Sequence, residues 1–123
     1  MPYKEEYLDE SVIRNPEISE LVLEVSEKVL EEEIPPRMII YASDGVNESH
    51  VDEDRVYFST RDFEKLDRTA GLGLVAHEIA HVCLKHGINK EPKMADEKEA
   101  DSLATRWGFK EEIEKLRKEF PLK

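Results

Sequence analysis

Residues 70–86 of the chain have the sequence AGLGLVAHEIAHVCLKH, and this stretch decides the fold. Apolar residues occupy almost every side of a helix drawn through it. A helix that is apolar all round belongs in the interior of a domain. Thr69 is expected to cap its start, and Gly87 is a natural stop at its end. We therefore expect a buried central helix over about residues 70–86, with the rest of the chain packed around it.

The same stretch contains HEIAH, residues 77–81. Two histidines four residues apart on a helix lie about 40° apart around its axis and one turn apart along it, so His77 and His81 can bind one metal ion. Glu78 lies beside them, where it can reach a metal-bound water without being a ligand. Imidazole pairs suit Zn²⁺, which needs a third protein ligand in a catalytic site. The alternative is a pair of hydrogen-bonded core histidines.

The third ligand is expected downstream, in the sequence EKEAD at residues 97–101. On a helix Glu97 and Asp101 share a face, so Glu97 can bind the metal while Asp101 accepts a hydrogen bond from the far nitrogen of a ligand histidine. Glu99 is the rival ligand. It lies two residues from Glu97 and points to the opposite side, so we expect it to be solvated.

Three further residues resemble ligands but are given other roles. His86 lies about 140° around the helix from His81, so it is expected to cap the helix C-terminus instead of completing the site. Cys83 is two positions from His81 and is expected to pack in the core. His50 is expected to be a surface residue, with substrate contact as the alternative.

The remaining elements suggest an α+β fold made of one helix, a small sheet and then further helices. Asn15 and Pro16 are typical of a helix start, and Pro35 ends that helix. Short β-branched stretches predict strands at 37–42 and 56–58, with a long loop or a third strand between them. Further helices are expected at about 62–66, 94–107 and 109–120. The whole chain, 1–123, is predicted to be one domain with an N-terminal tail over residues 1–15.

Composition excludes several classes of protein. The 123 residues include 18 Lys plus Arg and 29 Asp plus Glu, a net charge of −11. This acidity argues against nucleic acid as a partner and against docking on an anionic membrane. No stretch approaches the ~20 apolar residues of a membrane span. With one cysteine and no signal-peptide pattern at the start, the chain is predicted to be cytoplasmic. The lack of Gln and the wealth of Glu and Lys favour a thermophilic source.

The sequence LVAHEIAH, residues 74–81, followed by EKEAD at 97–101, resembles the gluzincin metallopeptidases. More narrowly, it is similar to the catalytic core of the M48 family (HtpX type). Those relatives are embedded in membranes, so the chain looks most like the soluble single-domain minigluzincins of archaea. The resemblance implies a small twisted sheet, antiparallel or mixed, packed against the HExxH helix, the glutamate helix and flanking helices.

The same resemblance implies the roles of the site residues. His77, His81 and Glu97 would bind zinc, Glu78 would be the general base and acid, and Asp101 would orient a ligand. An edge strand would hold a peptide or protein substrate in an extended conformation, and we expect that edge in the 43–60 region without choosing the strand. The predicted function is thus that of a zinc-dependent endopeptidase.

Two points stay open at this stage. No spacing selects the group that would stabilise the tetrahedral oxyanion among Tyr57, His50 and Arg106. Two alternatives to an active peptidase also remain. One is a non-proteolytic zinc-binding module that regulates or binds another protein. The other is a latent form in which a terminal segment, residues 1–15 or Phe120 to Lys123, blocks the cleft.

Overall fold

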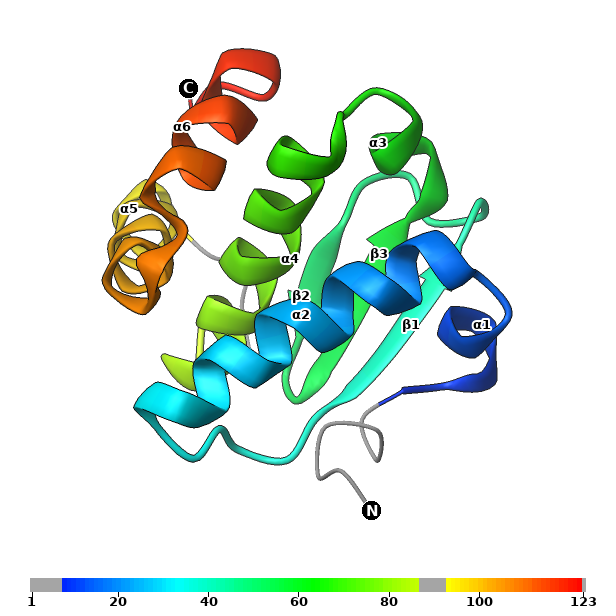
Figure 1. The fold of residues 1–123 in the computed structure, drawn as a ribbon, viewed down its shortest axis with the longest axis horizontal. Helices are drawn as coiled ribbons and strands as arrows, with labels where there is room; N and C mark the ends of the chain where they lie inside the picture. The colour runs from blue at the N-terminus through cyan, green and yellow to red at the C-terminus, as the bar shows by residue number, and fades with distance from the viewer. Residues whose placement is uncertain (1–7, 87–92, 123) are drawn as a thin grey trace.

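The computed structural model describes residues 8–86 and 93–122, and these form an α+β fold built around one central helix. That helix, α4 (Arg68–Cys83), packs against the sheet on one side and against α5 (Met94–Ala104) and α6 (Lys110–Glu119) on the other (Figure 1). Helix α2 (Pro16–Glu32) lies across it. Every residue of α4 from Ala70 to Val82 is buried, so the predicted central helix is confirmed.

Both ends of α4 differ from the prediction. The N-cap is Asp67, whose Oδ1 accepts a hydrogen bond from the Ala70 N–H at 2.9 Å, so the helix begins before Thr69. A carboxylate satisfies free N–H groups and also interacts favourably with the helix dipole, which favours Asp67 over Thr69. At the other end the helix stops at Cys83, and Lys85 adopts a left-handed conformation with φ of 60°. Gly87, the expected stop, lies outside the described residues.

The sheet is mixed and has the strand order β1-β3-β2. Strand β1 (Ile39–Ser43) runs parallel to β3 (Arg55–Ser59), and β2 (His50–Asp52) runs antiparallel to β3. The polar segment between the two predicted strands therefore carries a third strand. Helix α4 packs against β2 and β3, which brings the short edge strand β2 to the central helix.

The predicted N-terminal tail is wrong for residues 8–15, while residues 1–7 lie outside the described residues. Leu8 forms a bridge to Ile40 of β1, and a short helix α1 (Glu10–Ile13) follows. The Ser11 Oγ accepts a hydrogen bond from the Ala42 N–H at 3.1 Å, and Val12 is fully buried. The physical reason is that this segment buries an apolar side chain and covers the outer edge of β1.

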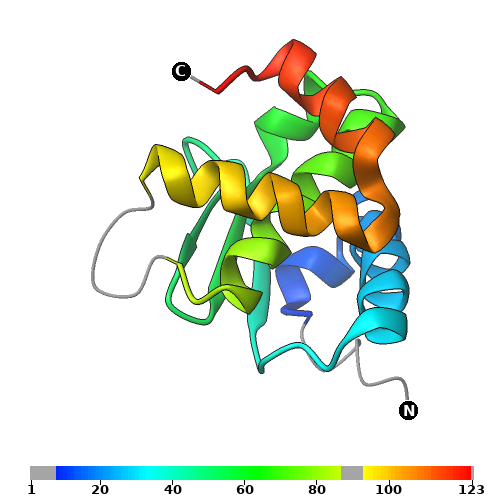
Figure 2. The ribbon, with the colours of Figure 1, turned by 90° about the vertical axis from the view of Figure 1, so that its left-hand side faces the viewer.

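The predicted helix at 94–107 ends earlier, because the chain turns between α5 and α6. A π-helical turn, Thr105–Phe109, joins them, and Gly108 within it has φ of 105°. This conformation favours glycine, and it allows Trp107 and Phe109 on either side to be buried. Figure 2 shows α5 lying across α4, so residues on its inner face meet those of the central helix.

Close packing of α4 against α6 depends on Gly73. A Cβ at this position would overlap the Glu112 carbonyl oxygen and lie 2.8 Å from its carbonyl carbon, both of them backbone atoms of α6. At Gly71 a Cβ would instead meet the end of the Leu21 side chain at 3.1 Å. We expect Gly73→Ala to lower the free energy of unfolding by roughly 1–3 kcal/mol, as overpacking does.

The matched control is Gly71→Ala. There a flexible side chain has to move, and the gain in helix propensity of roughly 1 kcal/mol offsets the shift. Urea unfolding of both variants with a chelator present measures the difference. Equal losses of stability in the two variants would contradict the close backbone contact at Gly73.

Candidate metal centre

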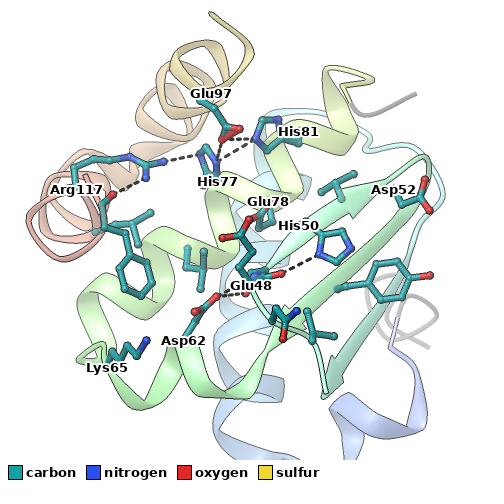
Figure 3. Close-up of a pocket in the computed structure, with 18 of the residues that line it drawn as sticks. Glu48, His50, Asp52, Asp62, Lys65, His77, Glu78, His81, Glu97 and Arg117 are labelled. Carbon is teal, nitrogen blue, oxygen red and sulfur yellow. Dashed lines mark hydrogen bonds and ion pairs between the residues drawn. The ribbon is translucent and has the colours of Figure 1, made fainter. Parts of the chain in front are cut away.

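Helices α4 and α5 bring the predicted ligands together. His77 and His81, on α4, are 4% and 2% exposed, and Glu97 comes from the first turns of α5. Figure 3 shows Glu97 reaching from α5 toward both imidazole rings. Helices α4 and α5 pack against each other, and both carry fully buried alanines: Ala76, Ala80, Ala100 and Ala104.

The three donor atoms form a small triangle. Glu97 Oε1 lies 2.8 Å from His77 Nε2 and 3.0 Å from His81 Nε2, and the two Nε2 atoms are 3.1 Å apart. In a tetrahedral zinc centre with bonds of about 2.0–2.1 Å, neighbouring ligand atoms lie about 3.3 Å apart. Two imidazole nitrogens and one carboxylate oxygen are also a donor set that zinc accepts in catalytic sites. These side chains therefore fit a metal ion after a small outward shift.

A hydrogen-bond network orients His77. Its Nδ1 lies 2.7 Å from Asp101 Oδ1, and since a carboxylate only accepts, Nδ1 carries a proton. Nε2, 2.8 Å from Glu97 Oε1, is then the nitrogen that would bind a metal in place of its own proton. Arg117 of α6 donates to both oxygens of Asp101 at 2.8 Å, and its Nη2 lies 3.1 Å from His77 Nδ1. Asp101 therefore makes the hydrogen bond to His77 that the sequence predicts, and Arg117 holds Asp101 from the other side.

Burial and hydrogen bonds shift the pKa values of His77 and Glu97 in the metal-free centre. Burial lowers the pKa of His77, but hydrogen bonds to Asp101 and Glu97 outweigh this effect and raise the pKa to about 9. Burial raises the pKa of Glu97, but hydrogen bonds from the two histidines hold it well below its ordinary value. Glu97 is thus ionised, the form in which a carboxylate binds metal.

Glu78 lies in the same cavity as the three ligands. Its side chain is buried, with a residue exposure of 5%, and burial raises the pKa of its carboxyl group. The cavity, of about 1320 Å³, is lined by His77, Glu78, His81 and Glu97 and also by strand β2 with the segment before it. A carboxyl group with a raised pKa, facing a metal-binding triangle across a cavity, is suited to accept a proton.

The segment before β2 is tied to α3 (Thr60–Glu64). The Ser49 N–H and Oγ both donate to Asp62 Oδ2, at 2.9 and 2.8 Å. His50 stacks on Tyr57, with ring centroids 5.1 Å apart. These contacts hold one wall of the cavity in place, opposite the ligands (Figure 3).

The candidates for oxyanion stabilisation divide into two groups. His50 and Tyr57 line the cavity, whereas Arg106 is exposed and is not among the lining residues.

Cys83 packs against the core as predicted, and burial raises its pKa to about 12. Arg117, which lines the cavity and holds Asp101, was missed by the sequence analysis.

Glu99 is solvated as predicted, with a side chain 58% exposed, and its Oε1 lies 2.7 Å from His86 Nε2. The prediction for His86 needs correction, because this residue was expected to cap α4 but its Nδ1 lies 2.9 Å from His81 Nδ1. The cause is the early end of α4 at Cys83, after which the left-handed Lys85 turns the chain. Neither residue is part of the ligand triangle, as the sequence analysis expected.

Comparison with family models, with curated proteins and with solved structures finds no match. The likeness to gluzincins therefore rests on the motif residues themselves. In the described part of the chain no helix is long and apolar enough to cross a membrane. What the geometry defines is a group of two histidines and a glutamate close enough to hold a metal ion.

Proposed function

We propose that this chain is a zinc-dependent metallopeptidase that hydrolyses peptide bonds. The observation that carries the proposal is the triangle of His77 Nε2, His81 Nε2 and Glu97 Oε1, with edges of 2.8–3.1 Å, in a cavity that also contains the Glu78 carboxyl group. A core histidine pair would need hydrogen-bond partners, but it would not need a buried glutamate beside it.

The division of labour in the proposed reaction follows from the chemistry of each group. Zinc held by His77, His81 and Glu97 would supply Lewis acidity toward the scissile carbonyl and lower the pKa of a water molecule. Glu78 accepts the proton of the attacking water and passes it to the leaving amine. Asp101 accepts the Nδ1 proton of His77, which would leave Nε2 as the nitrogen that binds the metal.

Strand β2 is the proposed docking edge for an extended peptide. Among the described strands β2 pairs with β3 alone, and His50, Val51 and Asp52 all line the cavity. The other edge of the sheet, along β1, is covered by Leu8 and α1. A peptide added beside β2 would gain main-chain hydrogen bonds while its scissile bond faces the ligands.

A latent form is a second proposal, and one observation favours it. Phe120 and Pro121 line the same cavity, and the Phe120 carbonyl accepts a hydrogen bond from Arg117 Nη1 at 3.0 Å. The C-terminal segment is therefore close enough to narrow the cleft. The other segment considered as a block is residues 1–15. Residues 8–15 pack along β1 and none of them lines the cavity, and residues 1–7 lie outside the described residues.

Removal and restoration of the metal test the proposed activity. We expect the zinc-loaded protein to cleave a broad peptide mixture, the chelated protein to leave it intact, and added zinc to restore cleavage at the same bonds, all read by mass spectrometry. Absence of cleavage by the zinc-loaded protein would contradict an active peptidase. Cleavage gained by deleting residues 120–123 would then support the latent form, and continued absence of cleavage would favour a non-proteolytic zinc-binding module.

A further inference from the structure

The second metal-binding histidine has a partner of its own on the side away from the triangle. His81 Nδ1 lies 2.9 Å from His86 Nδ1, and His86 Nε2 lies 2.7 Å from Glu99 Oε1 and 3.5 Å from Asp96 Oδ1. The His86 side chain is only 9% exposed. The ligand histidine is thus joined through a second imidazole to a carboxylate of α5.

Only one proton fits between the two Nδ1 atoms, because a neutral imidazole is a donor at one nitrogen and an acceptor at the other. If His81 carries that proton, its Nε2 has a free lone pair that can bind a metal ion held together with Glu97 and His77. His86 then accepts at Nδ1 and carries its own proton on Nε2, which donates to Glu99. With zinc on His81 Nε2, every group in this hydrogen-bonded series has a matching partner.

The opposite arrangement suits only the metal-free centre at the His81 end, where an Nε2 proton donates to Glu97 Oε1 at 3.0 Å. A proton on His86 Nδ1 leaves His81 with its proton on Nε2, where it blocks metal binding. It also turns the lone pair of His86 Nε2 toward the carboxylates of Asp96 and Glu99, which only accept. Glu99 therefore favours the arrangement in which His81 can be a ligand.

We propose that His86, held by Glu99, is a positioning residue that fixes His81 in its metal-binding tautomer. The proposal rests on the metal centre assigned under the proposed function. It treats His81 as the counterpart of His77, which Asp101 and Arg117 orient. Partners of this kind usually change metal affinity 10–100-fold.

The proposal also assigns a role to a second group of possible ligands. Donor atoms of His86, Asp96 and Glu99 lie within 4.8 Å of one another, close enough for a metal ion. A metal on His86 Nε2 would require the proton on its Nδ1, and that arrangement removes His81 from the first site. With neutral rings the two positions are therefore mutually exclusive, and the second is a hydrogen-bonding group when the first holds zinc.

Two variants separate positioning from packing. His86→Ala removes the acceptor of the His81 proton and is expected to weaken zinc binding 10–100-fold in competition with a chromophoric chelator. His86→Asn places an amide oxygen near the position of Nδ1 and is expected to recover most of that affinity. Circular dichroism with a chelator present checks that both variants fold. Equal loss in the two folded variants, or no loss in His86→Ala, would overturn the proposal.

The tautomers themselves can be observed in the unaltered protein. In zinc-loaded protein labelled with ¹⁵N-histidine, long-range ¹H–¹⁵N spectra should show a proton on His81 Nδ1 and on His86 Nε2. A metal-bound or unprotonated His86 Nε2, or two tightly bound zinc ions per chain, would contradict the proposal. Neither readout needs a substrate. If the tautomers are as stated and no peptide is cleaved, the proposed activity fails while this inference stands.

Discussion

Replacing Glu78 with glutamine is expected to lower the rate of peptide hydrolysis by roughly 10²–10⁴-fold, the usual contribution of a general base and acid. Glutamine has nearly the same shape as glutamate but cannot accept the proton of the attacking water. The three ligand side chains are untouched, so zinc affinity should change far less than the rate. Initial rates on a peptide identified as a substrate, with zinc content measured in parallel, give both quantities.

The stability of the metal-free Glu78→Gln protein should stay the same or rise although its activity falls. The Glu78 carboxyl group is buried, and burying a carboxylate is costly because it loses its hydration. Glutamine removes that cost, so the urea midpoint of the metal-free variant should equal or exceed that of the original chain. An activity loss caused by unfolding would instead appear as a lower midpoint.

Glu48 provides a matched control in the same cavity. Its side chain is exposed, and only its backbone carbonyl contacts the His50 ring, accepting a hydrogen bond from Nδ1. Glu48→Gln removes one negative charge from the cavity without touching a proposed catalytic group. Comparable activity in the Glu48→Gln and Glu78→Gln proteins would refute the role given to Glu78.

The parts of the site that the sequence predicted are those set by spacing within a single helix. His77, Glu78 and His81 lie within one turn of α4, so their relative placement follows from helix geometry alone. The same holds for Glu97 and Asp101 on α5. The short turn between the two motifs made their pairing predictable, although the residues at 87–92 lie outside the described part of the chain.

The parts that were missed depend on where helices end and on which helices meet. His86 would point away from His81 on a continuous helix, but α4 ends at Cys83 and the chain turns back. Arg117 is one of several charged residues on an amphipathic helix, and no local pattern distinguishes it from its neighbours. Its role follows from the packing of α6 against α4, which sequence spacing does not encode.

A similar limit applies to the N-terminal segment. Helix α1 is four residues long, too short to show a hydrophobic period. Its position depends on Val12 entering the core and on hydrogen bonds to β1, including Asp9 N–H to the Ile40 carbonyl at 3.0 Å. These are contacts with a strand about 30 residues away in sequence, and each segment alone gives no sign of the other.

Replacing Asp101 with alanine is expected to have the largest effect on the stability of the metal-free protein. Its side chain is 15% exposed and that of Arg117 is 22% exposed, and two hydrogen bonds of 2.8 Å join them. Removing one member of a buried ion pair leaves the other charge without its partner, at a cost of roughly 3–5 kcal/mol. Partial exposure of Arg117 places the expected loss near the lower end, at about 3 kcal/mol. His77 loses its orienting acceptor as well, so zinc affinity should fall roughly 10–100-fold.

The stability lost in Asp101→Ala should depend on pH. Burial raises the pKa of Asp101, but hydrogen bonds from Arg117 and His77 outweigh it and lower the pKa below the ordinary value of 3.8. A carboxyl group whose pKa is lower in the folded than in the unfolded state stabilises the fold at pH values above its unfolded-state pKa. This contribution disappears as the pH falls through the folded-state pKa. The difference in unfolding free energy between the original chain and Asp101→Ala should therefore be full at pH 7 and smaller below about pH 4.

A double-mutant cycle with Arg117→Ala separates the ion pair from simple loss of packing. Once Asp101 is alanine, removing Arg117 also removes the unpaired charge, so the double variant should be more stable than the sum of the two single losses predicts. Urea unfolding of the four chelated proteins at pH 7 gives the coupling energy. Additive losses would mean that Asp101 and Arg117 act independently, and the support of His77 would then rest on Asp101 alone.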